Sequence, residues 1–86
     1  MKKFKINKGF IAQKLGNKLT IFDAEESTLF TFNETASYIF QKLKLGWDID
    51  KIVEMLVLKF KIKEEKAQKD TLNFIKDLKS KKIIKS

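Results

Sequence analysis

Apolar residues recur at strand-like spacing in the first third of the sequence. The runs FIAQKL (10–15), LTIF (19–22) and TLFTF (28–32) have strand length and β-forming composition. Gly16-Asn17-Lys18 separates the first two runs, and Gly and Asn tolerate the positive φ of a tight hairpin turn. The polar segment 23–27 separates the second run from the third. Three strands joined by short turns predict an antiparallel β-meander.

At Asn33 the apolar spacing changes from two to about 3.6 residues. The apolar positions that follow are Ala36, Ile39, Phe40 and Leu43, which share one face of a helix. Asn33 is predicted as the N-cap, because its side-chain oxygen can accept a hydrogen bond from the first turn. Gly46 is predicted to end the helix. Phe30 and Phe32 are expected to form one core cluster with Ile39 and Phe40.

Two further helices are predicted after Gly46. The second begins at Asp48, and its apolar stripe consists of Ile49, Ile52, Val53, Leu56 and Phe60. The third begins near Glu64 and breaks at Ser80-Lys81-Lys82. Its core face consists of Ala67, Thr71, Phe74, Ile75 and Leu78. Ile83 and Ile84 are expected to fold back onto the core.

The order of the elements predicts one small α+β domain over residues 1–86. A three-stranded antiparallel β-meander is followed by three α-helices. Residues 1–9 are expected either to be flexible or to extend the first strand. Hydrophobic residues make up 43% of the chain, which suffices for one core. A domain of this size is nevertheless only marginally stable.

The composition excludes most kinds of catalytic site. The chain has no Cys and no His, so it lacks thiol nucleophiles, structural zinc sites and the commonest general base. Its acidic residues cluster in turns and at helix starts, where capping explains them, and it has no Gly-rich phosphate loop. We therefore expect a protein that is not an enzyme and has no catalytic residues, no metal site and no cofactor.

The sequence also gives no indication of a membrane protein. No apolar run approaches the ~20 residues of a membrane span. Residues 1–10 lack the apolar core of a signal peptide. We expect a cytoplasmic protein.

The net charge of +8 is unevenly distributed. Residues 1–18 carry six Lys and no acid, and residues 59–86 carry ten Lys against four acids. Residues 19–58 carry seven acids against three Lys, so two basic ends flank an acidic middle. This pattern favours an anionic partner, either nucleic acid or an acidic peptide. The alternative is that the lysines only solvate the surface.

The strand–helix junction and the third helix carry a recognisable pattern. At the junction its positions read Phe30, Phe32, Asn33, Thr35, Ala36, Ile39 and Phe40, followed by Gly46. In and after the third helix they read Asp70, Thr71, Phe74, Ile75, Leu78, Lys82, Ile83 and Ile84. Over roughly residues 10 to 84 the chain resembles the PqqD-like family of RiPP recognition elements. It departs from the family pattern at Thr71, where an apolar residue is usual, and at Lys82, where Gly is usual.

The resemblance implies a winged-helix-like domain that binds the leader segment of a ribosomally made precursor peptide. The leader would add as a strand to the third strand, against the third helix. The domain would then present the peptide to a modifying enzyme, often a radical SAM enzyme.

The residues suit such strand addition, in which main-chain hydrogen bonds supply affinity and side-chain pockets supply selectivity. The strand over 28–32 has no Pro, Lys or Gly to block pairing, whereas the first strand carries Lys14. An open edge of this kind could also pair with a second copy of the chain.

A stripe of residues flanks the core face of the third helix. Leu72 would suit an apolar peptide residue, and Lys69, Lys76 and Lys79 would suit acidic ones. The alternative is a solvated Lys face with one exposed Leu. The candidate peptide-binding residues are Thr28, Leu29, Phe30, Thr31, Phe32, Gln68, Lys69, Leu72, Ile75, Lys76 and Lys79.

A winged-helix DNA-binding protein that contacts phosphates through Lys is the alternative function. Two features disfavour nucleic acid. All nineteen basic residues are Lys, so the bidentate Arg contact to guanine is absent. The third helix also mixes Asp70 and Asp77 with its lysines.

Overall fold

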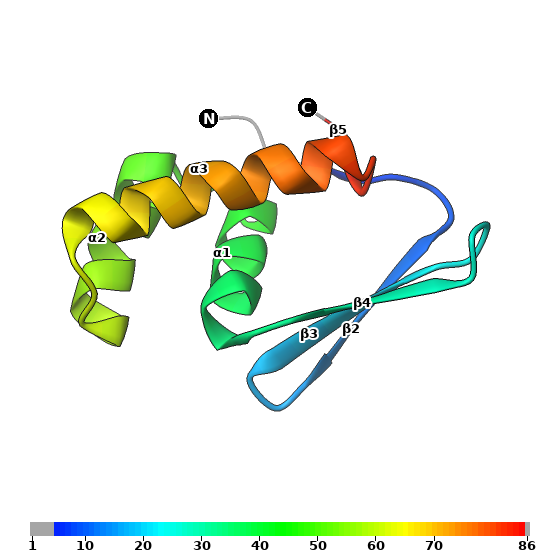
Figure 1. The fold of residues 1–86 in the computed structure, drawn as a ribbon, viewed down its shortest axis with the longest axis horizontal. Helices are drawn as coiled ribbons and strands as arrows, with labels where there is room; N and C mark the ends of the chain where they lie inside the picture. Colours follow the sequence, from blue (N-terminus) through cyan, green and yellow to red (C-terminus); the bar gives the residue numbers. More distant parts are fainter. Residues whose placement is uncertain (1–4, 86) are drawn as a thin grey trace.

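The computed structural model describes residues 5–85 (Figure 1). The elements are β1 (Lys5–Ile6), β2 (Phe10–Leu15), β3 (Lys18–Asp23), β4 (Thr28–Phe32), α1 (Glu34–Lys44), α2 (Ile49–Phe60), α3 (Glu64–Ser80) and β5 (Ile84–Lys85). The strands β2, β3 and β4 form an antiparallel sheet in that order, and the three helices follow. The predicted α+β fold is confirmed.

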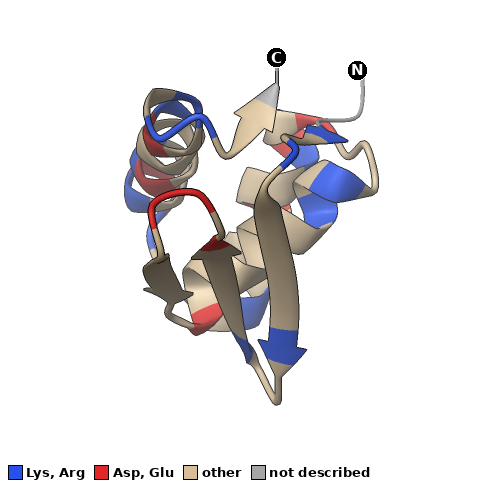
Figure 2. Ribbon diagram, turned by 90° about the vertical axis from the view of Figure 1, so that its right-hand side faces the viewer, with Lys and Arg blue, Asp and Glu red and all other residues tan. Residues whose placement is uncertain are grey.

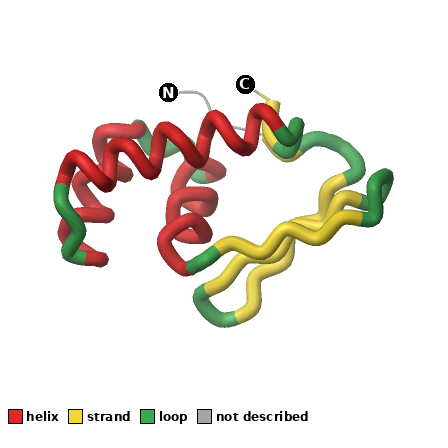
Figure 3. Tube along the Cα trace, viewed as in Figure 1, coloured by secondary structure: helices red, strands yellow, loops and turns green. Residues whose placement is uncertain are grey.

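The sheet lies at one end of the molecule and the helices at the other (Figure 3). Its inner face is apolar and packs on the helices, with Leu19 and Ile21 buried and Phe30 and Phe32 packed against the core. Successive side chains of a strand point to opposite faces, so the residues between these four lie on the outer face.

A second, two-stranded sheet joins the two ends of the described chain. β1 pairs antiparallel with β5, and Ile6 is the partner of Ile84. The alternatives predicted for residues 1–9 did not include this pairing, and residues 1–4 lie outside the described part. Ile83 and Ile84 are buried, which confirms that the C-terminal residues fold back onto the core.

The predicted aromatic cluster is confirmed at the junction of β4 and α1. The ring of Phe32 lies 6.4 Å from that of Phe40 and 5.1 Å, edge to face, from that of Phe74 on α3. Asn33 is the N-cap of α1, and its Oδ1 accepts a hydrogen bond of 2.8 Å from the amide of Ala36. The strand therefore enters the helix at a residue that both caps and turns the chain.

Two helices end in Schellman motifs, in which a residue of positive φ follows the last turn. After α1 this residue is Gly46, with φ of 88°, as predicted. The amides of Gly46 and Trp47 then bond to the carbonyls of Leu43 and Lys42. After α3 the same position is held by Lys82, with φ of 59°. This geometry explains why Gly is usual where this chain has Lys82.

Two polar side chains are fully buried in the core, and both are hydrogen-bonded. The Thr71 hydroxyl donates to the carbonyl of Ala67 one turn earlier, at 2.7 Å, so this polar residue fits a position where an apolar one is usual. The other is Ser37 on α1, whose hydroxyl donates to the carbonyl of Phe32 at the end of β4. No helix within residues 5–85 is long and apolar enough to cross a bilayer.

Candidate functional site

The candidate site begins at the outer edge of β4, the side of this strand that faces away from β3. β4 pairs with β3 on one side, and no strand within residues 5–85 pairs with the other side. The C-terminal strand β5, which could have covered this edge, pairs with β1 instead. Figure 2 shows β4 at the margin of the sheet nearest α3, with an acidic turn before its start. Glu25 and Glu26 lie in this turn, and Asp23 ends β3. The backbone along this margin can accept another strand.

The register shows which backbone groups of β4 face outward. The amide of Ala24 donates to the carbonyl of Gly9 at 2.8 Å, so even-numbered residues of β3 bond toward β2. Odd-numbered residues of β3 therefore bond toward β4, where their partners are Thr28, Phe30 and Phe32. By the same alternation, Leu29 and Thr31 direct their amides and carbonyls away from the sheet. These two residues therefore supply the main-chain donors and acceptors along the outer edge of β4.

Ser37 of α1 fixes the end of β4 against the helix. Its Oγ accepts a hydrogen bond of 2.8 Å from the amide of Leu19 on β3 and donates one of 3.3 Å to the carbonyl of Phe32 on β4. Leu19 and Phe32 are register partners, so the hydroxyl joins the two strands at the last rung of their ladder. The position of the edge is thus set by a buried side chain of the neighbouring helix.

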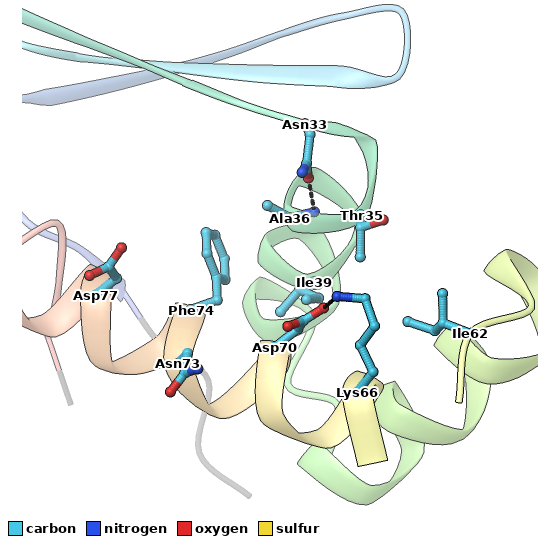
Figure 4. A pocket seen from close by; sticks show the side chains of 10 residues that line it. All are labelled: Asn33, Thr35, Ala36, Ile39, Ile62, Lys66, Asp70, Asn73, Phe74 and Asp77. Carbon is cyan, nitrogen blue, oxygen red and sulfur yellow. Dashed lines mark hydrogen bonds and ion pairs between the residues drawn. The ribbon is translucent and has the colours of Figure 1, made fainter. Parts of the chain in front are cut away.

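A cavity of about 510 Å³ opens where β4 ends, between α1 and α3 (Figure 4). Its lining residues are Asn33, Thr35, Ala36, Ile39, Ile62, Lys66, Asp70, Asn73, Phe74 and Asp77. We call this space the α1–α3 cavity. Because Asn33 directly follows β4 and Phe74 contacts Phe32, the cavity continues the edge of the strand. An extended chain that runs along β4 therefore reaches it.

The α1–α3 cavity combines an apolar interior with a polar rim. Ile39, Ile62 and Phe74 supply apolar surface. On the rim, Lys66 Nζ lies 3.1 Å from Asp70 Oδ2, and Lys81 Nζ lies 3.3 Å from Asp77 Oδ2. Both pairs join residues one helical turn apart at α3 and are largely exposed, so each contributes little to stability. The cavity suits an apolar side chain and has little net charge of its own.

The predicted site residues fall into two groups in the structure. Thr28 to Phe32 form β4 and lie along the open edge. The predicted helical residues do not line the α1–α3 cavity. Gln68 borders a groove against α2, together with Val53 and Val57, and Ile75 is buried in the core. Lys69 and Leu72 line a shallow hollow beside Gln68, and Lys76 and Lys79 are exposed.

The flank of α3 that faces the α1–α3 cavity was not among the predicted site residues. It consists of Lys66, Asp70, Asn73, Phe74 and Asp77. Most of these residues have a neighbour in the set three or four positions away, so they lie on one side of the helix. A signal for this flank was present, because Phe74 was predicted on the core face of the third helix. Residues one turn from Phe74 share its side of the helix, whereas Gln68 and Leu72 lie on the other flank.

A separate surface between α1 and α2 groups lysines with aromatic rings. Lys42 Nζ lies 4.7 Å from the ring centre of Trp47 and 5.1 Å from that of Tyr38, and Lys59 Nζ lies 5.8 Å from that of Tyr38. Burial raises the pKa of the Tyr38 hydroxyl. Cation–π contacts with aromatic rings of the same chain thus explain why Lys42 and Lys59 lie on this surface. Residues 5–85 contain no group of three acidic side chains placed to hold a metal ion.

Most of the chain matches a known protein family. Residues 19–84 match the model of the family described as coenzyme PQQ synthesis protein D, PqqD. The chain belongs to this family. The resemblance to PqqD-like domains, based on the strand–helix junction and on α3, is confirmed, and the matched region includes β4 and the lining of the α1–α3 cavity.

Two solved structures share the PqqD-family fold of this chain. One is TbiB1 in complex with the TbiA(beta) leader peptide, with a TM-score of 0.82, 17% identity and 95% of each chain covered. The other is a lasso peptide synthetase B1 complexed with the leader peptide, with a TM-score of 0.87 and 16% identity, covering 99% of this chain and 100% of that one. No curated protein matches the sequence.

Proposed function

We propose that this chain binds the leader segment of a ribosomally synthesised precursor peptide by strand addition to β4, and presents that peptide to a modifying enzyme. The observation that carries the proposal is the unpaired edge of β4 beside the α1–α3 cavity. Leu29 and Thr31 offer outward amides and carbonyls, which would hold an extended segment without regard to its sequence. Selectivity would come from the side chains that line its path.

The geometry also indicates what such a segment contains. Peptide residues opposite Phe30 and Phe32 would point to the inner face of the sheet, as those two side chains do. The peptide would then run past Asn33 to the α1–α3 cavity, which suits an apolar side chain. The ligand is therefore an extended segment with apolar residues at alternate positions.

Family membership and shared fold support this assignment. TbiB1 and the lasso peptide synthetase B1 were both solved with a leader peptide bound, and both share the fold of this chain. We assign the chain no catalytic step, since its part is to hold the peptide for another protein. The enzyme that takes the peptide would be of the kind that PqqD-like domains serve, often a radical SAM enzyme, acting in the cytoplasm where precursors are made.

Two other uses of the molecule compete with this proposal. A second copy could pair along β4, but it would occupy the edge that the peptide needs. Nucleic-acid binding is not favoured by family membership, and Asp70 and Asp77 border the cavity beside β4.

An NMR titration tests the proposal. The probe is a synthetic peptide with the leader sequence of a precursor encoded beside this chain. We expect amide shifts at Leu29, Thr31, Asn73 and Phe74, because these residues border the path of the peptide. A scrambled peptide of the same composition is the control. Shifts confined to α2, or equal shifts with the scrambled peptide, would refute the proposed cleft.

A further inference from the structure

The outer face of the sheet carries a continuous row of exposed apolar side chains. Ile11, Phe22 and Leu29 are successive cross-strand partners on β2, β3 and β4. Their exposed fractions are 60%, 37% and 62%, so solvent reaches all three. We call them the outer row. Most exposed apolar residues are scattered singly, whereas these three are aligned across the whole sheet.

The outer row ends at the edge where the proposed peptide adds. Leu29 is its last member, and it is also one of the two residues whose backbone groups face outward. A strand paired with β4 lies about 4.8 Å beyond it. The peptide residue directly opposite Leu29 points to the same face as Leu29 and becomes the fourth member of the row.

We propose that Leu29, the member of the outer row at this edge, is a second selectivity site for the bound peptide, one that prefers an apolar residue opposite it on the outer face of the sheet. The proposal rests on the proposed strand addition. It adds a requirement on the side of the peptide that points away from α3 and from the α1–α3 cavity. The preferred peptide thus has an apolar side chain that points outward opposite Leu29 and, at a neighbouring position, an apolar side chain that points inward.

The next outer position has the opposite character. Thr31 is the partner of Thr20, which is the partner of Gln13, so that row is polar. The peptide residue opposite Thr31 joins these polar neighbours, and the residue between the two points inward beside Phe30. Along β4 from Thr31 to Leu29, the peptide pattern is polar outward, apolar inward, apolar outward.

The expected discrimination is moderate. A favourable cross-strand pair contributes enough to change affinity by about two- to five-fold, whichever direction the peptide runs. Introducing a charge at Leu29 should reverse the preference, because opposite charges directly across two strands attract and like charges repel.

The first stage of the test is selection of displayed random twelve-residue peptides on the full chain. Wild type should enrich peptides with inward apolar residues and an apolar outward residue. The variant Leu29→Glu should enrich Lys or Arg at one position and leave the inward positions unchanged. That position should lie an odd number of residues from the inward apolar ones, because it faces the other way.

The matched control is Ile11→Glu. Ile11 belongs to the same row, has nearly the same exposure and receives the same charge, but it lies two strands from β4, roughly 10 Å away. It should retain the wild-type preference. A second variant, Leu29→Thr, removes the apolar neighbour without adding charge. Amide spectra check that all three variants are folded.

The second stage measures affinities with one enriched peptide carrying Val or Lys at the identified position. Wild type and Ile11→Glu should bind the Val peptide about two- to five-fold more tightly, Leu29→Thr should show no preference, and Leu29→Glu should prefer Lys. The outer-row proposal is overturned, and strand addition stands, if peptides bind but no peptide position responds to Leu29→Glu. It is also overturned if the position that responds is one whose side chain points inward. If folded wild type enriches no extended peptide, both proposals fail.

Discussion

At the scale of single residues, the buried hydroxyl of Ser37 connects β3, β4 and α1. Ser37→Ala should lower the free energy of unfolding by about 1–3 kcal/mol, because the buried amide of Leu19 loses its partner. Urea denaturation followed by circular dichroism measures the change.

The control for this prediction is Thr71→Val, which removes the other fully buried hydroxyl. The Ala67 carbonyl that accepts from Thr71 still receives its helical hydrogen bond, so stability should be retained to within about 1 kcal/mol. Equal losses in the two variants would contradict a special role for Ser37.

Lys82 tests the cost of a side chain in a left-handed conformation. Its φ of 59° suits Gly better than any residue with a Cβ. Lys82→Gly should therefore raise the free energy of unfolding by about 1 kcal/mol, seen as a higher midpoint in thermal or urea unfolding. Lys82→Ala keeps the Cβ and should give no such gain. A loss of stability on introducing Gly would show that the backbone strain at Lys82 is smaller than the entropy that Gly adds to the unfolded chain.

At the scale of elements, the two edges of the sheet should respond differently to proline. Backbone hydrogen-bonding groups alternate in direction along a strand, so the amides of Thr31 on β4 and Lys14 on β2 point away from β3. Pro at either site therefore removes no hydrogen bond of the sheet. Thr31→Pro should weaken leader-peptide binding about tenfold or more, because a main-chain donor is lost and the ring obstructs the added strand.

Lys14→Pro makes the matched change on the other edge and should leave peptide affinity unchanged. Fluorescence anisotropy with a labelled leader peptide measures both variants, and their unfolding midpoints show whether the sheet persists. Equal weakening by both substitutions would argue against β4 as the docking edge.

The two flanks of α3 can be separated by a second matched pair. Asn73 lines the α1–α3 cavity as well as the hollow of Lys69 and Leu72, whereas Gln68 lines that hollow and the groove against α2 but not the cavity. Asn73→Arg places a long side chain in the cavity and should lower peptide affinity about tenfold, since an apolar peptide residue loses its burial. Gln68→Arg adds the same charge and should have little effect. The reverse ranking would assign the peptide to the flank predicted from sequence.

These elements also show what the sequence could and could not predict. The strands, the Asn33 cap and the Gly46 helix end follow from local spacing and from residues with strong conformational preferences, and the structure confirms them. The sequence placed Phe74 on the core face of α3, but which flank of that face borders the cavity depends on packing between Phe74 and Phe32, which are far apart in sequence, so local spacing could not decide between the two flanks. The pairing of β1 with β5 involves strands of two residues, which carry no periodic signal.

At the scale of the whole molecule, the net charge of +8 predicts little about peptide affinity. Lys66, Asp70 and Asp77, which border the α1–α3 cavity, already form ion pairs along α3, so backbone and apolar contacts should dominate binding. Raising NaCl from about 50 to 200 mM should lower peptide affinity less than tenfold, whereas a protein held by many phosphate contacts loses about a thousandfold or more. Isothermal titration over a salt series gives the slope. A loss of the larger size would support recognition through lysines.

The pairing of β1 with β5 brings residues 5 and 85, at the two ends of the described chain, side by side. A polypeptide that enters and leaves a domain at one spot can be inserted into a larger protein, or joined head to tail and reopened elsewhere, without stretching its fold. Tethers attached at that corner leave the open margin of the sheet clear. The domain is thus suited to fusion with another protein, because such a fusion would leave the proposed peptide-binding edge of β4 accessible.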